Sequence, residues 1–196
     1  MIFIGDIHGE FARYKAIINQ RPNSIQLGDM GVGFPDYDPS QFPEFYYHRF
    51  IRGNHDNPEV CRKHPNYLGD YGFIPQHSIY YVSGAWSIDK NLRIPGLSWW
   101  EEEELSYKQF LDVIKQYKEV EPKIVISHDC PLSVMKSMFD LQPYPSRTGQ
   151  AFNSMLEEHK PKFWVFAHHH VPAVRVKHID GTTFVCLGIE QTIEIK

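Results

Sequence analysis

Short apolar runs, each ended by glycine or a polar motif, recur along the chain and predict a series of buried strands. The first run covers residues 1–5, and the second covers residues 24–28. Between them, residues 10–20 carry apolar side chains at helical spacing. A strand, an amphipathic helix and another strand form a βαβ unit, whose strands pair in parallel. The pattern therefore predicts an α/β fold.

The rest of the chain continues the alternation of strands and helices. We predict further strands over residues 45–52, 123–127, 162–167, 174–179, 182–187 and 191–195. We predict further helices over residues 58–64, 106–119, 131–139 and 148–160. Asn57 suits a helix cap and Pro58 the first helical position. The dipeptide Asp180-Gly181 suits a hairpin turn between two of the last strands.

The segment from residue 65 to residue 98 has no helical period. Glycine and proline interrupt its apolar stretches, from which we predict short strands at residues 73–74, 78–82, 86–88 and 93–97. Four consecutive acids follow at residues 101–104. We expect them to form the solvated first turn of the next helix, where the helix dipole favours negative charge.

Composition indicates one globular domain over residues 1–196, with 42% hydrophobic and 22% charged residues. The net charge of −4 gives no overall basic footprint for long nucleic acids. The three cysteines fit neither a disulfide framework nor a cysteine-type zinc site, which favours a reducing compartment. We find no signal-peptide pattern and no apolar run long enough to span a membrane, so we expect a cytoplasmic protein without a membrane partner.

Five of the apolar runs end on polar motifs that carry candidate chemistry. These motifs are Gly5-Asp6-Ile7-His8-Gly9, Gly28-Asp29, Gly53-Asn54-His55-Asp56, Ser127-His128 and Ala167-His168-His169-His170. In α/β sheets such carboxyl ends of strands converge on one rim, where ligands bind. If the last run continues as a strand, His168 and His170 share a face and His169 points away from it.

Convergence of these strand ends gathers a set of nitrogen and oxygen ligands. The set is Asp6, His8, Asp29, Asn54, His128, His168 and His170. Seven ligands are too many for one tetrahedral zinc ion. They suit two divalent cations that share one carboxylate.

The order of these motifs from Asp6 to His170 resembles the pattern of the calcineurin-like metallophosphoesterase superfamily. Among the metal motifs the chain departs from that pattern once, because Ala167 stands where the family has its last glycine. The resemblance implies a four-layer α/β/β/α sandwich, in which two mixed β-sheets pack face to face between flanking helices.

The resemblance also implies a role for each matching residue. Asp6, His8 and His170 correspond to ligands of the first metal, Asp29 to the bridging ligand, and Asn54, His128 and His168 to ligands of the second. His55 matches a histidine that faces the substrate without binding metal. His169 falls between two ligands and has no role in the pattern.

This ligand set predicts hydrolysis of a phosphoester. Two divalent cations lower the pKa of bound water, so that a bridging hydroxide can attack phosphorus in line near neutral pH. His55 is the expected general acid, and Asp29 and His55 are the expected catalytic residues. Imidazole, carboxamide and carboxylate ligands favour Mn²⁺, with Fe²⁺, Zn²⁺ or Mg²⁺ as alternatives.

The resemblance to the phosphoprotein-phosphatase branch is partial. Its motif Gly-Asp-x-x-Asp-Arg-Gly is absent around Asp29, although Arg52 before Gly53 echoes that branch. We therefore expect a phosphodiester or a nucleotide-like substrate, with Arg52, Asn54 and His55 as substrate-binding residues. A phosphomonoesterase or serine/threonine protein phosphatase is the alternative. A non-catalytic scaffold and a nuclease acting on long nucleic acid are further, less favoured readings.

Substrate specificity is expected from segments outside the metal motifs, namely residues 31–43, 67–100 and 141–147. Trp99 and Trp100 suit stacking on a base, although core packing is the more common role for such residues. The same choice applies to Tyr37, Phe73 and Trp86. The expected partner is a small phosphoester or nucleotide, and the sequence leaves the oligomeric state open.

Overall fold

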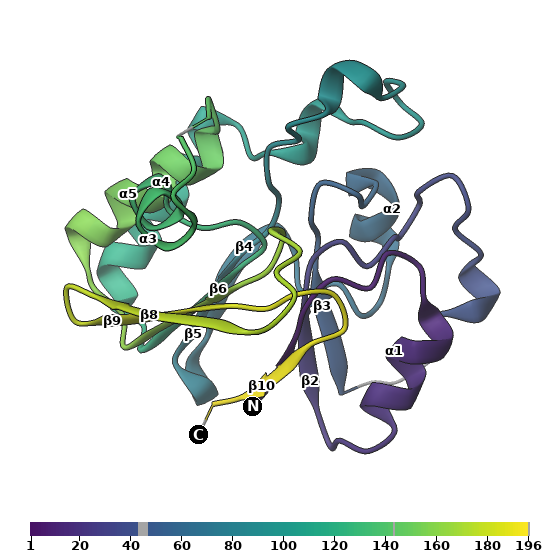
Figure 1. Cartoon of the computed structure of the whole chain (residues 1–196), viewed down its shortest axis with the longest axis horizontal. Coiled ribbons are helices and arrows are strands. Elements are labelled where there is room, and N and C mark those ends of the chain that lie inside the picture. Colours follow the sequence, from purple (N-terminus) through teal and green to yellow (C-terminus); the bar gives the residue numbers. More distant parts are fainter. Residues whose placement is uncertain (43–46, 143, 196) are drawn as a thin grey trace.

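Two β-sheets lie face to face at the centre of the molecule (Figure 1). The computed structural model describes residues 1–42, 47–142 and 144–195. In spatial order, the four-stranded sheet contains β10 (Thr192–Glu194), β1 (Ile2–Ile4), β2 (Ser24–Leu27) and β3 (His48–Ile51). The six-stranded sheet contains β4 (Tyr71–Ile74), β5 (Ile79–Val82), β6 (Ile124–Ser127), β7 (Phe163–Phe166), β9 (Thr182–Cys186) and β8 (Arg175–Ile179).

Both sheets are mixed, as expected. β1, β2 and β3 pair in parallel, while β10 joins β1 antiparallel. β5, β6, β7 and β9 pair in parallel, while β4 and β8 close the two edges antiparallel. Asp180 and Gly181 form the tight turn between β8 and β9, both at positive φ (47° and 90°). The predicted hairpin is thereby confirmed.

Helices cover the outer face of each sheet. α1 (Phe11–Ile18) and α2 (Pro58–Lys63) contribute to one core with the four-stranded sheet. α3 (Tyr107–Val120), α4 (Leu132–Phe139) and α5 (Arg147–Glu158) pack on the six-stranded sheet in another. A third core lies between the sheets. Three cores between four layers make the predicted α/β/β/α sandwich.

Strand periodicity assigns neighbouring residues to different cores. Phe3 faces the other sheet, whereas Ile2 and Ile4 face α1. In β7, Val165 faces the other sheet, whereas Trp164 and Phe166 face the helices. Alternate side chains of a strand point to opposite faces. Because helices or a second sheet cover both faces, these runs are continuously apolar.

The segment between β5 and α3 differs from its prediction. Residues 86–88 and 93–97 do not form strands. They belong to an irregular excursion over residues 86–104, here called the arm, which contains short 3₁₀ turns at Lys90–Leu92 and Glu101–Glu103. In Figure 1 the arm is the teal segment that projects beyond the two sheets. The expected third strand, residues 45–52, begins at His48, and residues 45–46 lie outside the described residues.

The acids at residues 101–104 are not the solvated first turn of α3. That helix begins later, at Tyr107, because Ser106 and Gln109 form a capping box there. Glu103 and Glu104 are buried, with 3% and 6% of their surface exposed. Glu104 accepts hydrogen bonds from Ser146 and Thr148. No described helix is long and apolar enough to cross a membrane.

Candidate metal centre

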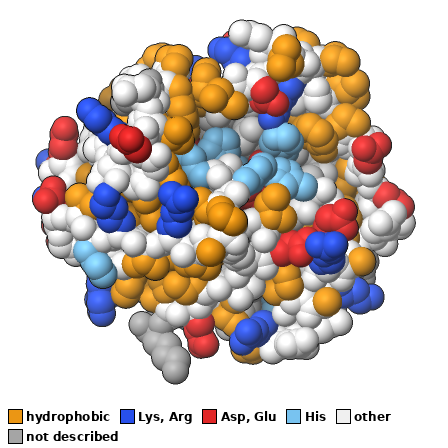
Figure 2. All heavy atoms as spheres, in the orientation of Figure 1, with side chains coloured by type: hydrophobic (Ala, Val, Ile, Leu, Met, Phe, Trp, Pro, Cys, Tyr) orange, Lys and Arg blue, Asp and Glu red, His pale blue; other side chains and the backbone are white. Residues whose placement is uncertain are grey.

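The predicted ligands meet at the carboxyl ends of the parallel strands of both sheets. Figure 2 shows a group of histidines in a hollow near the centre of one face. Asp6, His8, Asp29 and His170 offer ligand atoms within 4.8 Å of one another. Asp29, His128 and His168 form a second such group. Asp29 belongs to both groups, so its carboxylate stands where a bridging ligand is expected.

In the first group, ring nitrogens face a carboxylate from different parts of the chain. The Nε2 atom of His170 lies 3.1 Å from Oδ2 of Asp6 and 3.0 Å from Nε2 of His8. The Nε2 atom of His8 lies 4.0 Å from Oδ2 of Asp29. These atoms converge from the ends of β1, β2 and β7.

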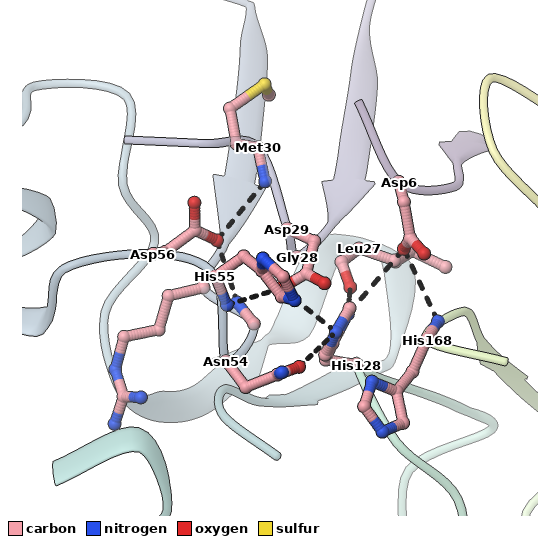
Figure 3. A network of polar contacts seen from close by, with 12 residues as sticks. Asp6, Leu27, Gly28, Asp29, Met30, Asn54, His55, Asp56, His128 and His168 are labelled. Atoms are coloured by element: carbon pink, nitrogen blue, oxygen red, sulfur yellow. Dashed lines mark hydrogen bonds and ion pairs between the residues drawn. The ribbon is translucent and has the colours of Figure 1, made fainter. Parts of the chain in front are cut away.

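In the second group, His128 is oriented by the backbone. Its Nδ1–H donates to the carbonyl of Leu27 at 2.7 Å, and a carbonyl can only accept. In the neutral ring the Nε2 atom keeps its lone pair, and it lies 3.2 Å from both Oδ1 of Asp29 and Oδ1 of Asn54 (Figure 3). The His168 ring lies beside His128, with centroids 4.9 Å apart.

Two buried carboxylate oxygens test whether a metal fits here. Oδ2 of Asp29 is buried and has no hydrogen-bond partner, while Oδ2 of Asp6 is buried and faces Nε2 of His170 at 3.1 Å without a formed hydrogen bond. A buried unpaired carboxylate oxygen is costly unless a cation balances it. The imidazole nitrogens and the carboxamide and carboxylate oxygens gathered here suit divalent transition metals. The residues present therefore fit a metal centre.

The pKa values of His128 and His168 indicate that a positive charge is favoured beside Asp29. Burial alone would lower the pKa of His128. The Asp29 carboxylate and then Asp6 outweigh burial, so the pKa of His128 rises to about 10. A cation is thus favoured beside Asp29. Burial lowers the pKa of His168 to about 4, so its ring is neutral near pH 7 and can donate a lone pair.

The backbone at these positions is unusual. His8, Asp29, His168 and His170 have φ of 49°, 53°, 66° and 43°, in the left-handed region that residues with a Cβ seldom adopt. β7 has ended at Phe166, so strand alternation does not orient the histidines. The turn after the strand does, and it brings His168 to the second group and His170 to the first.

Glycine allows the strand ends to approach one another. A Cβ atom on Gly53 would lie 2.2 Å from Oδ1 of Asp29 and 2.6 Å from Nε2 of His128. Both distances are far below van der Waals contact. A side chain larger than that of glycine at position 53 would therefore clash with Asp29 and His128.

Asn54 is oriented by a chain of hydrogen bonds that starts in the arm. Its Nδ2 donates to Oγ of Ser87 at 3.0 Å, and that hydroxyl donates to Oε2 of Glu103 at 2.5 Å. The Ser87 hydroxyl can only accept from Asn54 once it donates to a carboxylate. Oδ1 of Asn54 is thereby turned toward His128. We did not predict a role for Glu103.

Asp56 ties two ligand loops together, and it was likewise missed. Its buried carboxylate accepts hydrogen bonds from four backbone N–H groups, and Figure 3 shows the one donated by Met30. The donors are Met30, Gly31, Val32 and Gly53, at 2.7–3.2 Å. Met30 and Gly53 directly adjoin the ligands Asp29 and Asn54. Asp56 is the last residue of the Gly-Asn-His-Asp motif, and its place in that motif could have indicated its role from the sequence.

His55 lies beside the cluster and contacts an arginine that sequence reasoning did not select. Nη2 of Arg93, in the arm, lies 2.5 Å from Nε2 of His55. Arg93 also pairs with Asp89 at 2.8 Å. Burial lowers the pKa of His55 and Asp29 raises it, and Arg93 lowers it again, so that the pKa of His55 lies below its ordinary value.

Arg52 does not lie at the centre, contrary to its predicted role in substrate binding. Its side chain is fully buried and its Nε donates to Asp70 at 3.0 Å. Its Nη1 donates to the carbonyl of Glu103 at 2.8 Å. These partners hold the guanidinium group between the sheet and the base of the arm.

His169 points away from both ligand groups, as expected, but it is not free. Its Nε2 lies 3.3 Å from Oδ1 of Asp129 and 3.5 Å from Sγ of Cys130. Its ring stacks on Phe139, with centroids 4.5 Å apart. The hydroxyl of Tyr144 donates to the other oxygen of Asp129. His169 therefore anchors the turn that carries His168 and His170.

A comparison with one solved structure agrees with this fold. GAP50, the anchor in the inner membrane complex of Plasmodium, superposes with a TM-score of 0.51 at 10% sequence identity, covering 96% of this chain and 71% of that chain. At this identity the likeness concerns the fold alone. The phosphopantetheinyl hydrolase PptH from Mycobacterium tuberculosis gives a TM-score of 0.48 at 13% identity, covering 96% and 89%.

No curated protein matches the sequence. The model of the calcineurin-like phosphoesterase family, in contrast, matches residues 1–172. That span contains both ligand groups and every motif from which they were predicted. The chain belongs to the calcineurin-like phosphoesterase family.

Proposed function

We propose that the protein is a binuclear metal-dependent hydrolase of a phosphodiester or nucleotide-like substrate. The observation that carries the proposal is the position of Asp29. Its buried carboxylate belongs to both ligand groups, and one of its oxygens has no hydrogen-bond partner. A shared carboxylate is what two adjacent cations require.

We assign one ion to Asp6, His8, Asp29 and His170. We assign the other to Asp29, Asn54, His128 and His168. Mn²⁺ is our preferred metal for these donors, with Fe²⁺, Zn²⁺ or Mg²⁺ as alternatives. When bound, the two ions supply positive charge for a phosphate and lower the pKa of water enough to provide a nucleophile.

The chain itself supplies a proton donor and a phosphate contact. We assign the donor to His55 and the contact to Arg93, whose guanidinium group lies beside it. Arg93 and burial lower the pKa of His55. A bound phosphate would oppose this effect, because nearby negative charge raises the pKa of an imidazole. The substrate thus favours the protonated His55 that a general acid must be.

Two cavities that meet at His55 support a diester. One, of about 410 Å³, is lined by Asp29, Asn54 and His168 and extends toward the arm. The other, of about 400 Å³, is lined by His8 and Gly31 and extends toward Phe34. A phosphate at the metal cluster would have space on both sides, as two ester groups require. The net charge of −4 favours a small substrate over a long nucleic acid.

The experiment is hydrolysis of bis-p-nitrophenyl phosphate and p-nitrophenyl phosphate by Mn²⁺-loaded protein, with Asp29→Asn as the matched variant. We expect turnover of the diester and its loss in the variant. A much faster monoester rate would assign the alternative, a phosphatase. No turnover of either ester, with two ions bound, would indicate a non-catalytic scaffold.

A further inference from the structure

The cavity that extends from the metal cluster toward the arm has an apolar wall. Trp86 and Ile88 of the arm line it, together with Leu141 and Tyr144 from the segment before α5. The rings of Trp86 and Tyr144 stack at 4.8 Å between centroids and 19° between planes. The hydroxyl of Tyr144 donates to the buried Asp129, which fixes that ring. The wall is therefore flat and held in place.

Two aliphatic side chains on this wall are open to solvent. Ile88 is 80% exposed and Leu141 is 47% exposed. Both lie at the same cavity as the ligands Asp29 and His168. Covering this apolar surface with an apolar part of a ligand removes it from water and therefore favours binding.

The two cavities at His55 differ in charge, which decides what each accepts. Among the described residues that line the arm-side cavity, Arg93 supplies the one guanidinium or ammonium group, and Asp89 pairs with it. Each cavity is lined by two carboxylates, Asp29 and Asp89 on the arm side and Glu10 and Asp36 on the opposite side, so the difference between them is Arg93. The arm side thus combines an apolar wall with a cation suited to a phosphate oxygen.

We propose that Trp86, Ile88, Leu141 and Tyr144 form a subsite for a flat apolar group esterified to the phosphate, such as a nucleobase-bearing or aryl group. A planar ring packs against the wall that Trp86 and Tyr144 form at this cavity. The aliphatic side chains close over its edges, and Arg93 contacts the phosphate beside it. The subsite rests on the proposed function for the placement of the phosphate.

The test compares two phosphonates that share one anionic head. Benzylphosphonate carries a ring at the distance of an aryl ester, and ethylphosphonate does not. Each is measured as an inhibitor of bis-p-nitrophenyl phosphate hydrolysis and, by calorimetry, as a ligand of the Mn²⁺-loaded protein. We expect benzylphosphonate to bind at least about tenfold more tightly to the wild type.

Variants then locate the preference. Trp86→Ala should bring the two phosphonates to within about threefold of each other, since the stacking surface is lost. Ile88→Asn and Leu141→Asn change exposed side chains, so they should keep the fold and weaken benzylphosphonate alone. Leu92→Ala is the control, because Leu92 is 89% exposed on the same arm and does not line the cavity.

The outcomes separate the subsite from the proposed function. Equal binding of the two phosphonates by the wild type, or an unchanged preference in all three subsite variants, would overturn the subsite even if the diester is hydrolysed. Absence of hydrolysis would overturn the proposed function, and calorimetry would still decide the subsite. A ring preference that only the subsite variants remove would establish it.

Discussion

The guanidinium group of Arg93 lies 2.5 Å from the Nε2 atom of His55. These residues are 38 positions apart, and they meet because the arm folds back onto the end of β3. The contact places a fixed positive charge next to the metal cluster without using a metal motif. We propose Arg93, in place of Arg52, as the arginine that contacts a phosphate.

Arg93 should bind phosphate. Arg93→Ala should lower kcat/KM for bis-p-nitrophenyl phosphate about 100-fold, since a charge-assisted contact to the phosphate is lost. Arg93→Lys should recover part of it, because it keeps the charge without the planar fork. Steady-state kinetics on the Mn²⁺-loaded protein measure both. Lys115→Ala, on the exposed part of α3, is the control for loss of one positive charge. A wild-type rate in Arg93→Ala would remove Arg93 from the site.

Glu103 should control metal affinity from outside the ligand set. Glu103→Ala removes the acceptor for the Ser87 hydroxyl, so the hydroxyl that accepts from Asn54 and orients its side chain is no longer held in place. Loss of such a supporting contact typically weakens metal binding about 10–100-fold. Calorimetric Mn²⁺ titration should show this at one ion and leave the other unchanged. Glu101→Ala, at an exposed position of the same turn, should bind both ions normally. Equal effects of the two changes would contradict the assignment.

The three consecutive histidines should give three different results. His168→Ala and His170→Ala should each lose one of two bound ions and most activity. His169→Ala should keep both ions, because His169 faces Asp129 and Cys130. It should unfold more easily, by about 1–3 kcal/mol, since Asp129 loses a buried partner. Metal content and urea unfolding measure these effects. Loss of metal in all three variants would mean that the turn after β7 is wrongly described.

Asp70 should make stability depend on pH. Burial alone would raise the pKa of Asp70. Arg52, Tyr67 and Arg62 outweigh burial, so the pKa of Asp70 lies below its ordinary value. A depressed folded-state pKa adds stability above the unfolded pKa of about 3.9, and the gain disappears as pH falls through the folded pKa. Asp70→Asn should therefore cost about 3–5 kcal/mol at neutral pH, because Arg52 stays buried without a charge partner.

Urea unfolding at a series of pH values checks this. The difference between wild type and Asp70→Asn should be constant above about pH 5 and shrink below pH 4. A difference that does not change with pH would show that the ion pair with Arg52 is not its source.

The strand ends were predictable because their signals are local. An apolar run followed by Gly-Asp or Gly-Asn-His requires only neighbouring residues, and parallel pairing brings such ends together. The placement of Asp6, Asp29 and His128 follows from that rule. The prediction of the four-layer sandwich also required the resemblance of the motif order to a known family.

The arm was not predictable in the same way. Its turns lack a period, and its contacts join distant residues, as when Arg93 meets His55 and Glu103 meets Ser87. Arg52 was misassigned for the same reason. Its partner Asp70 lies 18 positions away, and the sequence around Arg52 does not predict that pairing. Charged side chains in irregular segments acquire their roles from tertiary contacts alone.

We propose that Asp29 joins two metal ions in a phosphodiesterase centre. The most direct measurement is Mn²⁺ titration of metal-free protein while hydrolysis of bis-p-nitrophenyl phosphate is followed. We predict no hydrolysis without metal, binding of two ions per chain, and full activity only when both are bound. Hydrolysis by the metal-free protein, full activity with one ion, or no hydrolysis with two would contradict it.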